Sequence, residues 1–144
     1  MPRVKLELPE KFIFKTILAV RIDDINYGNH MSNDAYLKFM HEARLRFLAH
    51  FGYTEFDIEG VSMIMGDTAI VFKGESFYGD EITVEVTAGD FGTKSFDLYY
   101  RFSNTKTNQI VCEAKTGMVC FNYTSRKSVN VPDKFIVKLQ LNSR

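Results

Sequence analysis

The chain has 144 residues, enough for one domain with a sizeable core, and 45% of them are apolar, including 13 Phe and 7 Tyr. Lys plus Arg and Asp plus Glu number 18 each, which excludes the strongly basic surface typical of proteins that bind nucleic acids or anionic membranes. The N-terminal stretch MPRVKLELPEKFIF has no uninterrupted apolar run, and no later segment reaches membrane-spanning length, so we expect a soluble, cytoplasmic protein.

The first half of the chain predicts a strand, a polar loop and a long helix. Residues 12–21 alternate apolar and more polar side chains, as a strand does. A polar loop covers 24–33, and a helical pattern then runs to Gly52, a residue suited to a helix C-terminus. Apolar side chains cover about half of this helix, more than a surface helix requires, so we predict deep burial. They are Tyr36, Leu37, Phe39, Met40, Ala43, Phe47, Leu48 and Phe51.

After the helix, the apolar period changes to two and predicts a run of antiparallel strands. They cover 61–72, 81–87, 95–102 and 110–121, and Gly66 with Asp67 suggests a bulge in the first of them. The pattern leaves the structure of the tail from Pro132 open. A long apolar helix needs cover over most of its surface, which one curved antiparallel sheet provides. We therefore predict a single α+β domain over residues 1–144.

The two cysteines, Cys112 and Cys120, are eight residues apart in one predicted strand. A strand rises about 3.3 Å per residue, so they are separated by roughly 26 Å, beyond disulfide reach. The spacing favours a reducing compartment. Because no His or other Cys is grouped with them, we predict no structural zinc site.

The polar loop and the helix carry a family motif. The loop holds Asp24-Ile25-Asn26 and His30-Met31-Ser32-Asn33 before Tyr36, and the helix holds His41-Glu42-Ala43-Arg44. These motifs resemble, without insertion or deletion, those of the 4-hydroxybenzoyl-CoA thioesterase-like family, whose loop reads Asp-x-Asp-x-x-Gly-His-Val-Asn-Asn-x-x-Tyr. Tyr78-Gly79-Asp80-Glu81 and Gly92-Thr93-Lys94-Ser95 are similar to two turns of that family.

The resemblance implies a hotdog fold, in which a curved sheet wraps round a central helix. It also implies hydrolysis of an acyl-CoA or acyl-carrier-protein thioester. Coenzyme A then belongs to the substrate, and neither a separate cofactor nor a metal is implied. Sites of this fold usually form between subunits, so a homodimer or a dimer of dimers is expected.

Asn26 is the main departure from the family pattern. The family's thioesterases place their catalytic Asp at this position, as nucleophile or as base for water. A neutral amide can take neither role. Asn26 could instead position a water or the thioester, or simply close an Asx-turn, and both interpretations stay open. At positions 28 and 29 this chain has Gly and then Asn, where the family has a bulky residue and then Gly. The backbone of the loop can therefore differ in shape from that of the family.

Glu42 is the first candidate for the missing carboxylate. Another branch of hotdog thioesterases carries its acidic residue on the central helix and keeps an amide in the loop, and the pair Asn26 and Glu42 resembles that arrangement. Glu42 would then be the general base, although an ion pair with Arg46 at i,i+4 explains it equally simply. Asp24 is the second candidate, with loop capping as its alternative. His30 could act as base or donor, but a loop-shaping role is favoured.

The remaining candidates would bind substrate. Asn33 starts the helix, where a backbone N–H would polarise the thioester carbonyl, and the side chain of Asn33 or Ser32 would cap the helix. Tyr36 belongs to the core and could line an acyl pocket. Lys94 and Ser95 suit the phosphates or pantetheine of CoA, although solvation explains them equally well.

Three functions follow from these patterns. The first is acyl-CoA hydrolysis. The second is acyl-CoA binding without catalysis, because the usual Asp is missing. The third is enoyl-CoA hydration or dehydration, which is less well supported because the His-and-carboxylate signature of that reaction is absent.

Overall fold

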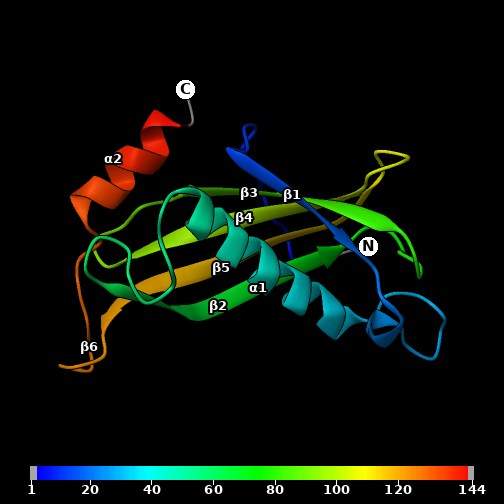
Figure 1. Ribbon diagram of the computed structural model, residues 1–144, viewed down its shortest axis with the longest axis horizontal. Helices are drawn as coiled ribbons and strands as arrows, with labels where there is room; N and C mark the ends of the chain where they lie inside the picture. Colours follow the sequence, from blue (N-terminus) through cyan, green and yellow to red (C-terminus); the bar gives the residue numbers. More distant parts are fainter. Residues whose placement is uncertain (1–2, 143–144) are drawn as a thin grey trace.

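One antiparallel sheet of six strands wraps round a long helix in the computed structural model, which describes residues 3–142 (Figure 1). Residues 1–2 and 143–144 of the predicted domain lie outside this range. The elements in chain order are β1 (Phe14–Ala19), a 3-10 turn (Ile22–Asp24), α1 (Asn33–His50), β2 (Ser62–Phe72), β3 (Glu81–Gly89), β4 (Ser95–Asn104), β5 (Ile110–Asn122), β6 (Lys127–Ser128) and α2 (Asp133–Leu141). The strand order is β1-β3-β4-β5-β2, with β6 paired to β5. The predicted hotdog arrangement is confirmed.

The core lies between α1 and the inner face of the sheet. Alternate residues of β3, β4 and β5 are almost fully buried there, as the period of two requires. The predicted apolar stripe of α1 faces them, except that Leu37 is exposed. Gly52 follows the helix with φ +85°, a left-handed conformation that suits glycine, so the predicted C-terminal cap is confirmed.

The predicted bulge in β2 is present. The register with β5 shifts between Met65 and Asp67, so one extra residue is accommodated at Gly66. The bulge directs the Asp67 carboxylate to the N–H of Gly117 (3.1 Å) and to the Nζ of Lys115 (3.3 Å). Because β2 is the last strand on its side, its other edge has no strand partner among residues 3–142.

The tail after Pro132 folds as helix α2, which the sequence pattern left open. Phe135 and Leu139, four residues apart, are its buried positions. The Phe135 ring packs against Tyr53 and Phe96, with centroid distances of 5.4 and 5.1 Å. α2 therefore closes one end of the core.

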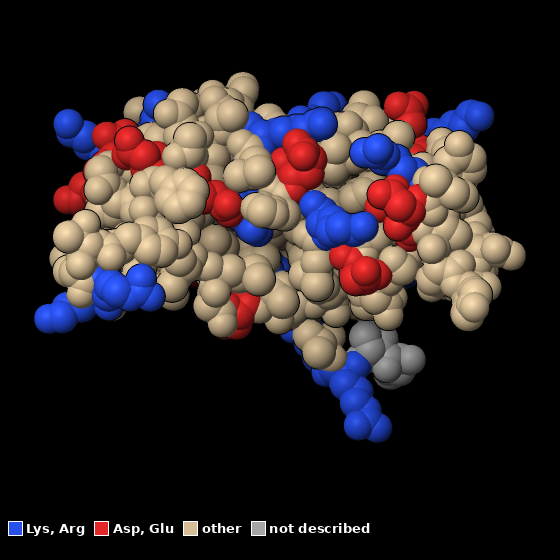
Figure 2. Space-filling view, turned by 60° about the horizontal axis from the view of Figure 1, so that its bottom comes forward, with Lys and Arg blue, Asp and Glu red and all other residues tan. Residues whose placement is uncertain are grey.

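The outer face of the sheet is polar and partly covered by the N-terminal segment. The guanidinium of Arg101 lies 4.4 Å from the ring centroid of Phe12. Figure 2 shows basic and acidic side chains interspersed, in agreement with their equal numbers in the sequence. Cys112 and Cys120 are both buried and free. Within residues 3–142, no helix is long and apolar enough to span a membrane.

Candidate active site

A cavity of about 390 Å³ lies between α1 and β1 and brings two predicted catalytic residues together. Asp24 and Glu42 both line it, from the 3-10 turn and from the middle of α1. Lys38 and Arg46 contribute positive charge, while Leu18 and Phe39 contribute apolar surface. Carboxylates, cations and an apolar wall around one space can hold a polar reacting group next to an apolar chain.

Glu42 forms the ion pair that its spacing predicts. The Nε of Arg46 donates to its Oε2 at 2.9 Å, and the two side chains are 51% and 45% exposed. Arg46 also donates to the Thr16 hydroxyl at 2.8 Å and to the Ile17 carbonyl at 3.3 Å. Arg46 therefore connects α1 to β1 and balances the charge of Glu42. The Glu42 carboxylate still lies at the cavity surface.

Asp24 is buried and caps the turn that precedes the polar loop. Its Oδ2 accepts from the Arg21 N–H at 2.8 Å, and its Oδ1 lies 3.5 Å from the Nζ of Lys38. Its carbonyl accepts from the Ser32 N–H at 2.8 Å. These contacts are those of a capping residue, the alternative role that the sequence suggests, and they also fix the carboxylate at the cavity wall.

The polar loop is a tight turn, and Asn26 closes it. The Gly28 N–H donates to Oδ1 of Asn26 at 2.9 Å, which forms the Asx-turn considered above. Asn29 adopts φ +64°, a left-handed conformation that Gly adopts without strain and that Asn tolerates better than most residues, so Asn fits this position of the turn. The Nδ1 of His30 lies 3.2 Å from the Met31 carbonyl and its Nε2 lies 4.0 Å from Glu75. Asn26 and His30 do not line the α1/β1 cavity.

The start of α1 differs in detail from the prediction. Ser32 occupies the N-cap position, but its side chain makes no capping hydrogen bond. Its hydroxyl instead lowers the pKa of Asp34, to which it hydrogen-bonds. Asn33 is the first helical residue and is exposed. In this first turn the Ala35 N–H already donates to the Ser32 carbonyl at 3.1 Å. The Asn33 N–H has no intrahelical acceptor, so it remains the candidate donor for an oxyanion.

The substrate-binding candidates lie far apart. Tyr36 is buried, and its hydroxyl donates to Ser76 at 3.3 Å, while its ring packs on Phe72 with centroids 5.3 Å apart. Burial raises the pKa of Tyr36, as expected of a core tyrosine. Lys94 and Ser95 lie at the start of β4, at the end of the sheet opposite the start of α1 (Figure 1). Tyr36 and the pair Lys94 and Ser95 therefore do not share one pocket.

The sequence did not identify a polar cluster that passes through the core. Arg44, inside the apolar arc of α1, donates through Nε to Glu55 at 2.7 Å and through Nη1 to the Tyr100 hydroxyl at 3.3 Å. The Tyr100 hydroxyl lies 2.8 Å from that of Thr116. His41 lies 3.1 Å from the other Glu55 oxygen. Arg44 therefore forms a structural ion pair, but no sequence spacing identifies Glu55 as its partner.

Metal-binding groups are not gathered in the part of the chain that the structure describes. Among residues 3–142, no three or more His, Cys, Asp or Glu side chains are arranged to hold a metal ion.

Comparisons with known proteins agree with the fold described above. A family model described as the thioesterase-like superfamily matches residues 20–139. A search of curated proteins finds no match. Slr0204, a 1,4-dihydroxy-2-naphthoyl-CoA thioesterase from Synechocystis, superimposes with a TM-score of 0.79 at 20% identity, over 88% of this chain and 95% of that chain.

Two further solved structures are similar. SAV2348 from Staphylococcus aureus, in complex with CoA, gives a TM-score of 0.80 at 17% identity, over 96% of this chain and 88% of that chain. BH1999, a gentisyl-coenzyme A thioesterase, gives 0.77 at 17% identity, over 88% of this chain and 99% of that chain. At these identities, the structural likeness shows a shared fold.

Proposed function

The chain belongs to the thioesterase-like superfamily, and from that premise we propose that it hydrolyses the thioester of an acyl-CoA or acyl-carrier-protein. The observation that carries the proposal is that Glu42 and Asp24 line one cavity beside α1. Similar structures with the same fold include two CoA thioesterases and a complex with CoA, which supports coenzyme A as part of the substrate. The proposed location is the cytoplasm.

In this mechanism Glu42 is the general base. It takes a proton from water, whose oxygen attacks the thioester carbon. The resulting oxyanion is stabilised by backbone N–H groups at the start of α1, near Asn33. When the tetrahedral intermediate collapses, the C–S bond breaks and the proton on Glu42 passes to the thiolate. The products are a carboxylic acid and the free thiol.

The length of α1 supports a role for Glu42 as general base and not as nucleophile. Asn33 and Glu42 are nine residues apart. That separation is about 13 Å along a helix that rises ~1.5 Å per residue. Helical side chains in general lean toward the helix start, and one bound water would extend the reach of the Glu42 carboxylate further. Direct attack by Glu42 on a carbonyl held at Asn33 is out of reach, so the proposal is water activation and not a covalent acyl-enzyme.

The test is hydrolysis of an acyl-CoA panel by wild type and Glu42→Gln, which removes the base and preserves the shape. Loss of a general base lowers the rate by at least about 100-fold. Arg46→Ala is the matched control, because it removes the partner of Glu42 and leaves the carboxylate in place. If Glu42→Gln retains the wild-type kcat/KM, Glu42 is not the base. Asp24→Asn and Asn26→Ala then test the remaining candidates.

A homo-oligomer is part of the proposal. β2 is an edge strand of 11 residues, and exposed Met65 and Phe72 lie along it. An unpaired, partly apolar edge of this length favours pairing with another strand. We propose that a second copy supplies that strand, giving a dimer that could assemble further into a tetramer.

Non-catalytic binding of acyl-CoA is the second candidate, and two observations favour it. Glu42 is neutralised by Arg46, and the side-chain oxygen of Asn26 is already bonded to Gly28. Measurable binding of a CoA ester without turnover across the panel would select this function. A gain of hydrolysis on Asn26→Asp would show that only the family's usual carboxylate is missing.

A further inference from the structure

An apolar groove lies beside the α1/β1 cavity. It has a volume of about 460 Å³ and is lined by the end of β1, the 3-10 turn and the turn between β2 and β3. Ile22, which is 71% exposed, lines it from the first turn, and Tyr78, which is 66% exposed, lines it from the second. Arg21 is the only charged residue in this lining, whereas charged side chains make up more than half of the lining of the α1/β1 cavity. The groove therefore offers apolar surface beside a highly charged site.

Ile22 and Tyr78 each belong to a turn that an aspartate closes. In the 3-10 turn, Oδ2 of Asp24 accepts from the backbone N–H three residues earlier at 2.8 Å. In the turn between β2 and β3, Oδ2 of Asp80 accepts from the backbone N–H three residues earlier at 2.9 Å. Both apolar side chains are thus held at the surface by the backbone of a closed turn. Since these turns are already ordered, little conformational entropy is lost when a ligand binds between them.

The backbone of Val20 and Gly79 lines the groove between these two turns. The Val20 N–H donates to the Asp80 carbonyl at 2.8 Å, and the Val20 carbonyl accepts from the Gly79 N–H at 3.0 Å. A Cβ at Gly79 would meet no atom within 4 Å, so the space above this glycine is open. Because both amide groups of Val20 are already paired, an apolar ligand that displaces water here leaves neither of them unsatisfied.

The groove is continuous with the α1/β1 cavity, because Ala19 and Arg21 line both. Ala19 is exposed at the end of β1, and its small side chain leaves a passage between the two spaces. The start of α1 lies at the same end of the molecule (Figure 1), where the Ser32 N–H donates to the Asp24 carbonyl at 2.8 Å. A thioester carbonyl bound to the Asn33 N–H would therefore lie near this passage.

We propose that this groove binds the acyl chain of the substrate, and that the substrate is the thioester of a flexible aliphatic acid. An alkyl chain inside the α1/β1 cavity would displace water from carboxylates and cations, which is unfavourable. Beyond Ala19, its methylene groups would instead be buried against Ile22 and Tyr78. This inference rests on the proposed function for the identity of the ligand. It assigns a role to two exposed apolar side chains that the hydrolytic step does not use.

The experiment measures the binding of S-butyl-, S-hexyl- and S-octyl-CoA, thioethers that carry an alkyl chain and cannot be hydrolysed. Burial of one methylene group strengthens binding by up to about fourfold, so calorimetry should show the affinity of the wild type rising at least about tenfold from S-butyl- to S-octyl-CoA. Ile22→Ser and Tyr78→Ser should each reduce this rise to less than about threefold and leave the binding of S-butyl-CoA unchanged. Ile22→Leu and Tyr78→Phe should retain the rise.

Two further variants test the passage and the specificity of the effect. Ala19→Phe narrows the passage, so it should also flatten the dependence on chain length, although Ile22 and Tyr78 are intact. Val137→Ser is the matched control, because it removes an apolar side chain that is 52% exposed on α2. It should show the same dependence on chain length as the wild type.

The thioethers separate this proposal from the proposed function, because their binding needs no hydrolysis. A wild type that hydrolyses no acyl-CoA, yet shows a chain-length dependence that Ile22→Ser and Tyr78→Ser lose, would refute the hydrolase and support the groove. A dependence that persists in both variants would refute the groove alone. Equal weakening of all three thioethers would also refute it, since the groove would then hold the pantetheine arm. So would a changed oligomeric mass in either variant, which would make the groove a subunit contact.

Discussion

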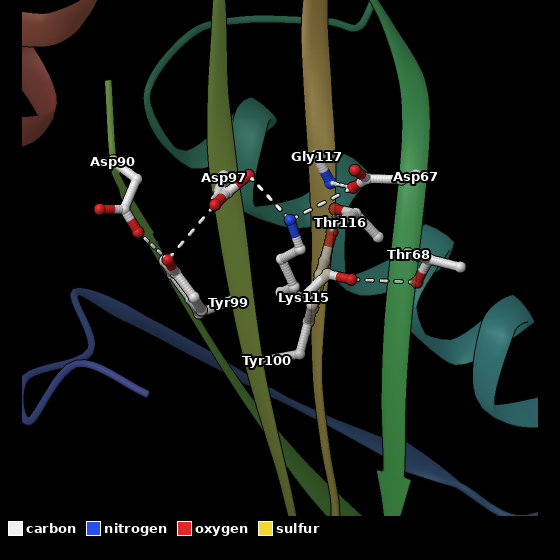
Figure 3. A network of polar contacts seen from close by, with 9 residues as sticks. All are labelled: Asp67, Thr68, Asp90, Asp97, Tyr99, Tyr100, Lys115, Thr116 and Gly117. Atoms are coloured by element: carbon white, nitrogen blue, oxygen red, sulfur yellow. Dashed lines mark hydrogen bonds and ion pairs between the residues drawn. The ribbon is translucent and has the colours of Figure 1, made fainter. Parts of the chain in front are cut away.

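The two faces of strands β4 and β5 carry two polar networks built from similar residues in different surroundings. Tyr99 is paired in register with Lys115, and both point to the outer face, whereas the adjacent Tyr100 and Thr116 point into the core (Figure 3). Outside, Lys115 lies between Asp67 and Asp97, with Nζ to oxygen distances of 3.3 and 3.5 Å. The Tyr99 hydroxyl donates to Asp90 and lies 3.4 Å from Asp97.

The difference between the faces lies in access to water. Asp67 is 67% exposed, so water can replace a lost partner in the outer network. Tyr100 and Thr116 are fully buried, and the side chain of Arg44, which donates to the Tyr100 hydroxyl, is 9% exposed. Burial raises the pKa of both tyrosines, and Asp90 raises that of Tyr99 further, so both hydroxyls stay protonated donors. Similar contacts should therefore contribute very differently to stability.

Arg44→Met should have the largest effect. Removing one partner of a buried ion pair leaves an uncompensated charge, at a cost of about 3–5 kcal/mol. Because Glu55 is 24% exposed, water can reach it, and we expect the lower end of that range, about 3 kcal/mol. Urea unfolding followed by circular dichroism measures the change.

Arg46→Ala is the control for this change, on the same helix. Its ion pair with Glu42 is about half exposed and has i,i+4 spacing, so its loss should cost about 0.5 kcal/mol. Similar losses for the two variants would contradict the conclusion that burial separates them.

Arg44 also shows how far the sequence could predict the molecule. Its place in the apolar arc of α1 required a partner, but Glu55 lies in an irregular loop whose position depends on packing against α1. The strands, the bulge at Gly66 and the end of α1 follow from local periods and turn residues. The tail helix α2 was missed because nine residues carry only two buried positions.

The candidate site was likewise predicted from the sequence only in part. The motif identified Asp24, Asn26 and His30 in the loop before α1 and Glu42 on α1 as polar groups, and the i,i+4 spacing predicted the contact of Glu42 with Arg46. Which of them share a cavity depends on how β1 packs against α1, so no spacing could separate Asp24 and Glu42 from the other two.

A pair of tyrosine variants compares the two faces directly. Tyr100→Phe leaves Arg44 and Thr116 without a buried hydrogen-bond partner, which should cost about 2 kcal/mol. Tyr99→Phe removes the corresponding hydroxyl from the outer face. Water can then hydrogen-bond to exposed Asp90 instead, so the change should cost less than about 1 kcal/mol. The free energies of unfolding of the two variants give the comparison, and a larger loss for Tyr99→Phe would reverse it.

The last effect that we predict, smaller than those of Arg44→Met and Tyr100→Phe, is a pH dependence of the stability of the buried cluster. Burial alone would raise the pKa of Glu55, but hydrogen bonding and positive charge from Arg44, with a further contribution from His41, hold it below its usual value. Folding therefore favours the ionised form. The resulting stability is complete above the pKa of the unfolded chain, about 4.3, and is lost as pH falls through the lower pKa of the folded protein.

Glu55→Gln isolates this contribution because it retains the shape and loses the charge. At pH 7 the variant should be about 1 kcal/mol less stable, since a hydrogen bond to a charged group is stronger than one to a neutral group. The stabilities of wild type and variant should converge below about pH 4.3 as Glu55 takes up its proton. Urea unfolding from pH 7 to pH 3 measures both curves. Parallel curves would show that the carboxylate titrates alike in the folded and unfolded chain, and would place Glu55 energetically with the water-exposed carboxylates of the outer face.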